Sequence, residues 1–252
     1  MPAPPSLAFR GVTKAYGAAR AVDEVSLTVA PGEFVALVGT SGSGKSTLLK
    51  MVNRLVVPDT GSVAIDGRDV ADDAPHRLRR RVGYVFQNIG LFPHLSVGEN
   101  VAIAARMGAP AVDIDAALGR VELPADMAGR MPDQLSGGQR QRVGVARALA
   151  GEARLLLMDE PFGALDPVTR DALGRRVRAL HERIGLTTIL VTHDMTEALL
   201  LADRVLVMSG GKIAADATPA DLMAGRAGPA ADALVAVPRE QAHALAALEK
   251  GT

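Results

Sequence analysis

Hydrophobic and polar positions along this chain follow the patterns of strands and helices in alternation. Residues 25–29 alternate apolar with hydroxyl side chains, which is the two-residue period of a strand with one buried face. Residues 34–38 form a continuous apolar run, which is typical of a strand covered on both faces. A glycine-rich segment follows, and residues 45–55 have the pattern of a helix. The pattern therefore predicts a strand, a loop and a helix in immediate succession.

The same alternation continues through the rest of the chain. Asp66-Gly67, between apolar residues 63–65 and Val70, is a hairpin signal. A helix is expected over residues 167–184. Short buried strands are expected at residues 82–87, 155–158, 188–191 and 205–208. Repeated strand–helix alternation predicts an α/β sheet fold.

One stretch in the middle of the chain has a different pattern. From residue 89 to about residue 130 the sequence is mostly helical, with prolines as interruptions, and a further helix is expected over residues 139–150. We therefore expect a helical subdomain inserted at about residues 89–150 within a single domain of residues 6–225. Residues 226–252 are expected to form a short Ala-rich tail without a separate regulatory domain.

Composition removes several classes of function. The formal net charge is zero and the pI is near 7, which argues against a nucleic-acid partner, because proteins that bind nucleic acids carry a basic surface. The chain has no cysteine, so disulfides and thiolate metal sites are excluded. No apolar run approaches the roughly 20 residues that cross a bilayer. Any membrane role is therefore expected to come through partner chains.

Residues 39–46, Gly-Thr-Ser-Gly-Ser-Gly-Lys-Ser, match the phosphate-binding pattern GxxxxGK[ST] between a strand and a helix. A glycine-rich turn before a helix is the simpler interpretation, but eight positions match in the required context. Glycines let the backbone approach phosphate oxygens with its N–H groups turned inward. Lys45 is expected to pair with the β- and γ-phosphates, and Ser46 to bind Mg²⁺. The expected phosphate-binding residues are Gly39, Thr40, Ser41, Gly42, Ser43, Gly44, Lys45, Ser46 and Thr47.

Two carboxylates follow the apolar run of residues 155–158. Asp159 and Glu160 would lie at the C-terminal end of a buried strand, where a polar pair can also simply end the strand. Beside a phosphate loop, Asp159 would hold a Mg²⁺-bound water and Glu160 would act as the base for an attacking water. Phosphoryl transfer depends on positioning and charge neutralisation, so these two roles suffice.

Residues 135–139, Leu-Ser-Gly-Gly-Gln, open the helix predicted for residues 139–150. A serine and two glycines at a helix start expose N–H groups to an anion. A plain N-cap is the other interpretation, and both can hold. With these five residues, the phosphate loop and the Asp-Glu pair, the chain resembles the ATP-binding subunit of ABC transporters from about Leu7 to Met223. The resemblance implies a P-loop NTPase core with a mostly parallel sheet, an N-terminal antiparallel β subdomain and the inserted helical subdomain.

The resemblance also implies roles for individual residues. Tyr16 would stack on the adenine of ATP, and Gln87 would reach Mg²⁺ and the attacking water. His193 would bind the γ-phosphate, and it also follows a predicted strand, at the sheet edge where α/β folds bind ligands. The other four histidines are expected on the surface or in packing. The Mg²⁺ ligands would be Ser46, Gln87 and Asp159, and the residues acting on the ATP of the opposite subunit would be Leu135, Ser136, Gly137, Gly138, Gln139 and Asp166.

The implied partners follow from the same family. A second copy of the chain would complete each ATP site in a nucleotide-sandwich dimer, and integral membrane permease subunits would dock on it. An extracytoplasmic solute-binding protein would act indirectly, and no nucleic acid is expected. The chain would lie peripherally on the cytoplasmic face of the cell (inner) membrane.

Residues 89–94, 141–150 and 158–170 are similar to the ABC subgroup that imports glycine betaine, choline and related osmoprotectants. The resemblance implies that these residues face a protein partner, so it gives the solute by association only. Amino acids, polyamines or anions are the alternative cargo.

Two other classes of protein fit less well. An ABC ATPase of DNA repair needs long arms between Lys45 and Leu135, which the spacing does not allow, and an ABC ATPase of translation needs two units in one chain. A P-loop kinase or GTPase explains neither residues 135–139 nor His193.

Overall fold

The N-terminal part of the chain forms a small antiparallel sheet. Residues 3–87, 89–106, 111–151, 153–163, 165–236 and 239–240 are described in this computed structural model. Asp66 and Gly67, with φ angles of 51° and 76°, form the turn that the sequence predicted. The strands follow the order β2-β1-β4-β5 and comprise β1 (Leu7–Tyr16), β2 (Ala19–Val29), β4 (Thr60–Ile65) and β5 (Arg68–Asp69).

A second, six-stranded sheet forms the centre of the molecule. Its order is β10-β9-β3-β8-β7-β6, and every neighbouring pair is parallel except β10 with β9. The mostly parallel sheet and the antiparallel N-terminal subdomain confirm the predicted fold class. The strands are β3 (Phe34–Val38), β6 (Val82–Val85), β7 (Leu155–Asp159), β8 (Thr187–Val191), β9 (Arg204–Ser209) and β10 (Lys212–Ala217).

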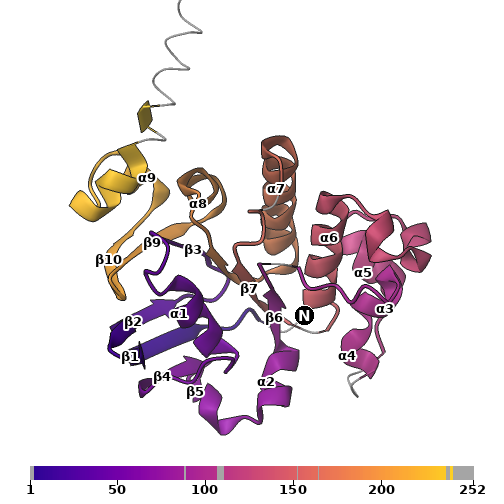
Figure 1. Ribbon diagram of the computed structural model, residues 1–252, viewed down its shortest axis with the longest axis horizontal. Helices are drawn as coiled ribbons and strands as arrows, with labels where there is room; N and C mark the ends of the chain where they lie inside the picture. Colours follow the sequence, from indigo (N-terminus) through magenta and orange to yellow (C-terminus); the bar gives the residue numbers. More distant parts are fainter. Residues whose placement is uncertain are drawn as a thin grey trace, which may run out of the picture.

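The central sheet is buried on both faces. Val35 and Leu37 of β3 pack in one apolar cluster with the antiparallel sheet and with helix α1 (Lys45–Val52). Phe34 and Ala36 pack in a second cluster with helices of the opposite face. Alternate residues of a strand point to opposite faces, so the continuous apolar run of β3 serves two cores. Figure 1 shows β1 and β2 on one side of this sheet and α7 (Pro167–Ile184) and α8 (Met195–Leu201) on the other.

The insert forms a lobe beside β6 (Figure 1). Its described helices are short except the last, and 3-10 turns at Ala125–Gly129 and Pro132–Gln134 join them. The mostly helical character expected for this stretch agrees with these elements, and the exact domain limits stay a prediction. The helices are α3 (Val97–Val101), α4 (Ile103–Arg106), α5 (Ile114–Arg120) and α6 (Gly137–Ala148).

Several element ends differ from the sequence prediction. Helix α1 ends at Val52 rather than residue 55, because Arg54 adopts a φ of 55°, outside the helical region. Helix α6 begins at Gly137 rather than residue 139, because Ser136 caps it. Strand β6 ends at Val85, two residues before the predicted end. The prediction for α7 matches its observed limits.

Three further short helices lie outside the insert: α2 (Pro75–Arg81), α8 and α9 (Pro219–Met223). Residues 229–236 are also helical. Helix α2 precedes β6, and α8 follows the loop after β8. Within the described ranges, no helix combines the length and apolar character that a membrane crossing needs.

Candidate functional site

The loop of residues 39–44 leads from β3 directly into α1, as predicted. Gly39 and Gly44 have φ angles of 149° and 103°. A Cβ atom at Gly39 would lie 2.2 Å from the Met208 carbonyl oxygen, and one at Gly44 would lie 1.9 Å from the Ala21 carbonyl oxygen. Both distances are far below van der Waals contact, so the loop passes against β9 and β2 only with glycine at these positions.

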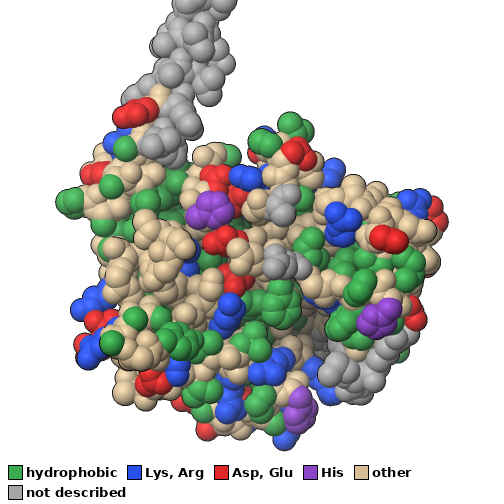
Figure 2. All heavy atoms as spheres, viewed as in Figure 1, with side chains coloured by type: hydrophobic (Ala, Val, Ile, Leu, Met, Phe, Trp, Pro, Cys, Tyr) green, Lys and Arg blue, Asp and Glu red, His purple; other side chains and the backbone are tan. Residues whose placement is uncertain are grey.

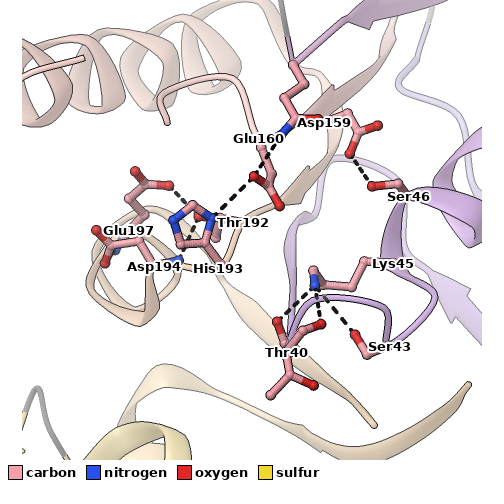
Figure 3. Close-up of polar contacts among 12 residues, drawn as sticks. Thr40, Ser43, Lys45, Ser46, Asp159, Glu160, Thr192, His193, Asp194 and Glu197 are labelled. Atoms are coloured by element: carbon pink, nitrogen blue, oxygen red, sulfur yellow. Dashed lines mark hydrogen bonds and ion pairs between the residues drawn. The ribbon is translucent and has the colours of Figure 1, made fainter. Parts of the chain in front are cut away.

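Lys45 folds back onto its own loop. Burial lowers the pKa of the Lys45 ammonium, while the charges of Glu160 and Asp159 oppose that shift. Such a loop can exchange its own carbonyls for phosphate oxygens as partners of the ammonium. The three atoms around Lys45 Nζ are Gly39 O at 2.8 Å, Thr40 O at 2.8 Å and Ser43 Oγ at 3.4 Å (Figure 3).

Asp159 ends β7 with its side chain almost fully buried. Its Oδ1 accepts a hydrogen bond of 2.6 Å from Ser46 Oγ (Figure 3), and its Oδ2 accepts one of 3.1 Å from the Tyr84 hydroxyl. Lys50 Nζ lies 3.4 Å from the same Oδ2. Burial, and then the Asp159 charge, raise the pKa of Tyr84. Sequence reasoning did not identify Tyr84 or Lys50, since neither belongs to a phosphate-binding pattern.

Glu160 follows in a left-handed backbone conformation, with φ of 46°. Its backbone N–H donates to Val191 O at 2.9 Å, which anchors the turn to β8. Its Oε2 accepts a hydrogen bond of 3.1 Å from Gln87 Nε2 and lies 3.3 Å from His193 Nδ1 (Figure 3). The structure thus brings together Gln87, Glu160 and His193, which come from three separate parts of the chain.

Hydrogen bonds and ion pairs on both sides of His193 along the chain hold the loop that carries it. Thr192 Oγ1 donates to Glu197 Oε2 at 2.6 Å and accepts from the Asp194 backbone N–H at 3.0 Å. Burial raises the pKa of the Glu197 carboxyl. Arg170 of α7 pairs with Asp194 at 3.1 Å and with Glu197 at 3.6 Å. Sequence reasoning did not identify Glu197. Its position on α8, four residues after His193, is the signal that could have found it.

The donor set fits a hard divalent cation. Ser46 Oγ and Asp159 Oδ1 are oxygen ligands that lie 2.6 Å apart. The Gln87 side chain is hydrogen-bonded to Glu160, the residue that follows Asp159. Mg²⁺ is usually bound by one or two carboxylates together with water and substrate phosphates. A cage of three or more His, Cys, Asp or Glu side chains does not occur in the described part of the chain.

Residues 135–139 form a separate site at the start of α6. Ser136 Oγ accepts from the Gln139 backbone N–H at 3.2 Å, and Gln139 Oε1 accepts from the Ser136 backbone N–H at 2.8 Å. The N-cap interpretation is therefore confirmed, and Ser136 stays exposed. Leu135 is buried beneath it. Among the described residues, no hydrogen bond joins this site to residues 39–46 of the same chain.

The start of α7 lies against these glycines. A Cβ at Gly138 would lie 2.8 Å from Thr169 Cγ2, and one at Gly137 would lie 3.4 Å from Leu165 Cδ2. Asp166 caps α7 by accepting from the Thr169 backbone N–H at 3.0 Å. Hydrogen bonds from Thr169 lower the pKa of the Asp166 carboxyl, which keeps the cap charged.

Tyr16 ends β1 with 54% of its surface exposed. Lys14 Nζ lies 5.7 Å from the centre of its ring. Asp59 holds this segment, pairing with Lys14 at 2.6 Å and accepting from the Ala15 backbone N–H at 2.8 Å. An exposed ring on a fixed strand end is a suitable stacking surface, and its contact with adenine stays a prediction.

Acidic and basic side chains are interspersed over the face in Figure 2, and no continuous basic surface is visible among the residues described there.

Comparisons with known proteins agree with this geometry. The sequence profile of the ABC transporter family matches residues 22–163. The chain is 46% identical over 220 residues to the glycine betaine uptake system ATP-binding protein YehX of Escherichia coli, covering 85% of this chain and 71% of that protein. It is 44% identical over 223 residues to the carnitine transport ATP-binding protein OpuCA of Listeria monocytogenes, covering 86% of this chain and 56% of that protein. The chain thus spans little more than half the length of several relatives it matches.

Among solved structures, the chain is similar to the dimeric structure of MJ0796, a bacterial ABC transporter cassette. The TM-score is 0.75 with 33% sequence identity, and the match covers 84% of this chain and 98% of that one. The phosphate loop, the paired carboxylates and the capped helix α6 all lie within residues 22–163, which match the family profile. The chain belongs to the ABC transporter family.

Proposed function

We propose that this chain is the ATP-binding and ATP-hydrolysing subunit of an ABC importer that takes up a small solute, a quaternary amine such as glycine betaine or choline. The observation that carries the hydrolytic part is the cluster of Gln87, Glu160 and His193, with Glu160 Oε2 within 3.3 Å of both neighbours. This cluster follows directly on Asp159, which is bonded to Ser46 of the phosphate loop.

The chain's own residues account for each part of the reaction. Lys45 leaves its loop carbonyls to meet the β- and γ-phosphates, and the loop N–H groups bind the phosphate oxygens. Glu160 takes a proton from the water that attacks the γ-phosphorus, and the bond to the β-phosphate oxygen of ADP breaks. His193 and Gln87 orient that water. Ser46, Asp159 and Gln87 would hold Mg²⁺, which would neutralise phosphate charge when bound.

The active form in this proposal is a dimer of two copies, arranged so that residues 135–139 of each copy meet the ATP held by the other. Two observations support it. The exposed start of α6 has no hydrogen bond to the phosphate loop within the described part of its own chain. Gly137 and Gly138 follow the Ser136 cap at the helix start, where backbone N–H groups attract an anion. MJ0796, which is similar in structure, was solved as a dimer.

Permease subunits are proposed to dock beside Gln87. Phe86 and Phe92, on either side of the loop after β6, are 45% and 41% exposed, and exposed aromatic side chains commonly mark protein contacts. The subunit would then lie peripherally on the cytoplasmic face of the cell membrane, with an extracytoplasmic solute-binding protein acting through the permease. No nucleic-acid partner is proposed.

A sulfate or thiosulfate importer is the second candidate. The chain is 46% identical over 223 residues to the sulfate/thiosulfate import ATP-binding protein CysA of Caulobacter vibrioides, covering 85% of this chain and 65% of that protein. Reconstitution with the permease and binding protein distinguishes the two. Stimulation of ATP turnover by betaine or choline supports the first candidate, and stimulation by sulfate alone overturns it.

Replacing Glu160 tests the hydrolytic part. In Glu160→Gln, ATP binding persists and the ATP-bound dimer accumulates, while turnover falls by about 10²–10⁴-fold, the usual contribution of a general base. Glu182→Gln is the matched control, because Glu182 is an exposed glutamate of α7 that pairs only with Arg178 among its described contacts. Equal turnover in the two variants would remove Glu160 from the role of base.

A further inference from the structure

The Asp159 carboxylate receives more donors than its expected role requires. Ser46 Oγ bonds to Oδ1 at 2.6 Å, which is the contact expected beside a Mg²⁺ site. Its other oxygen, Oδ2, has two further neighbours, the Tyr84 hydroxyl at 3.1 Å and Lys50 Nζ at 3.4 Å. Neither Tyr84 nor Lys50 belongs to the phosphate loop, the residue 135–139 site or the Gln87 cluster.

Tyr84 approaches Asp159 from a rigid position. It lies on β6, paired in register with Leu157 of the neighbouring β7, so the two strands fix the distance between the Tyr84 and Asp159 backbones. Its ring packs against Phe86, with ring centres 4.6 Å apart. The partly buried ring lies on the edge strand beside β7, and its hydroxyl points to Oδ2 of Asp159.

Without the Tyr84 hydroxyl, Oδ2 of Asp159 would keep only the longer contact with Lys50 at 3.4 Å, and the carboxylate would hold its orientation less firmly. The terminal torsion of aspartate is broad, and each orientation presents the two oxygens differently to a cation. The Tyr84 hydroxyl fixes Oδ2, which leaves Oδ1 facing Ser46. Outer partners of this kind commonly change metal affinity by about 10–100-fold when they are removed.

We infer that Tyr84 is a positioning residue that holds the Asp159 carboxylate in the orientation needed to bind Mg²⁺ together with Ser46. The inference rests on the proposed function, since it concerns the metal of that ATP site. Tyr84 acts through Asp159 and touches no substrate. Lys50 has the opposite effect on the metal, because it places a positive charge beside the same oxygen.

The opposite signs make the inference testable. Tyr84→Phe keeps the ring and its contact with Phe86, and it removes only the hydroxyl. It should raise the Mg²⁺ concentration for half-maximal ATP turnover by about tenfold. Lys50→Gln should lower that concentration by about twofold, a modest effect because Lys50 is partly exposed and its charge is screened. A packing defect would not move the two variants in opposite directions.

A second readout needs no turnover. The chain has two tyrosines and no tryptophan, so at the long-wavelength edge of the near ultraviolet, where adenine and phenylalanine absorb little, its absorbance reports Tyr16 and Tyr84. Adding Mg²⁺ to the ATP-bound chain should change the tyrosine absorbance in the wild type and in Tyr16→Phe, and should not change it in Tyr84→Phe. Tyr16→Phe is the matched control, since it removes the other hydroxyl.

Each outcome decides the inference. A tenfold higher Mg²⁺ requirement in Tyr84→Phe, with the metal-free ATP dissociation constant unchanged, supports it. An unchanged Mg²⁺ requirement in Tyr84→Phe, or a higher requirement in Lys50→Gln, overturns it. A wild type that hydrolyses no ATP with Mg²⁺ refutes the proposed function instead, so the two failures are distinguishable.

Discussion

Ser136 has two roles that substitutions can distinguish. It caps α6 within its own chain, and it is proposed to meet the ATP bound by the opposite chain. In Ser136→Ala the hydrogen bond from the Gln139 backbone N–H is lost. An N-cap serine is worth about 1 kcal/mol, which in a domain of this size lowers the Tm by about 2–4 °C. Ser136→Asp keeps the cap, because aspartate is as good an N-cap as serine, and its charge at the helix start adds about 0.3–1 kcal/mol.

The aspartate has the opposite consequence for the dimer. A carboxylate roughly 4 Å from one phosphate charge, at an effective dielectric constant of about 20, raises the energy by about 4 kcal/mol. That corresponds to a loss of about a thousandfold in ATP-dependent dimerisation. We therefore expect Ser136→Asp to be at least as stable as the wild type and unable to dimerise with ATP.

The assay combines thermal unfolding with size-exclusion chromatography in ATP, using the Glu160→Gln background so that the dimer persists. Ser136→Ala should form less dimer than the parent but more than Ser136→Asp. A Ser136→Asp variant that dimerises normally would show that residues 135–139 do not face phosphate. A large loss of stability in Ser136→Asp would refute the capping argument.

Further predictions concern the loop glycines and a buried histidine. Gly44→Ala should abolish ATP binding and destabilise the fold by about 1–3 kcal/mol more than Gly42→Ala does, because its Cβ would lie 1.9 Å from Ala21 O. Gly42→Ala, with φ of 79° and no atom within 4 Å of its Cβ, should cost only the left-handed backbone penalty of about 1–2 kcal/mol, as chemical denaturation would measure; equal losses in both variants would contradict the steric argument. Burial, and then Arg178, lower the pKa of His181, which bonds to Thr188 Oγ1 at 2.9 Å. Below the ordinary histidine pKa of about 6.5, the folded state therefore binds fewer protons than the unfolded state, and the free energy of unfolding should fall as the pH drops through about 6.5. His181→Asn should show a smaller fall in Tm over the same pH range. Identical pH profiles of the wild type and the variant would count against this assignment.

The central strands could be predicted because their burial appears directly in the sequence. Residues 34–38 are apolar without interruption, and the structure buries all of β3 on both faces. The phosphate loop and Asp159 could be predicted for a related reason, since their chemistry depends on spacing along the chain. In contrast, β1 has exposed and half-buried positions among its buried ones, and its mixed pattern gave no clear period.

The partners of the site could not be predicted, because they depend on which strands become neighbours. Tyr84 reaches Asp159 only because β6 pairs with β7, although the two residues are 75 positions apart. Glu160 meets Gln87 for the same reason, across 73 positions. The early start of α6 was missed because glycine normally disfavours a helix interior, and the capping box at Ser136 and Gln139 overrode that preference.

The left-handed backbone of Glu160 has a consequence for protein engineering. A non-glycine residue with φ of 46° costs about 1–2 kcal/mol relative to glycine, so Glu160→Gly would relieve a local penalty while removing the carboxylate. Selection of this chain for heat resistance alone would favour that exchange and would yield robust but inactive molecules. A directed-evolution campaign on this protein therefore needs a turnover screen in every round.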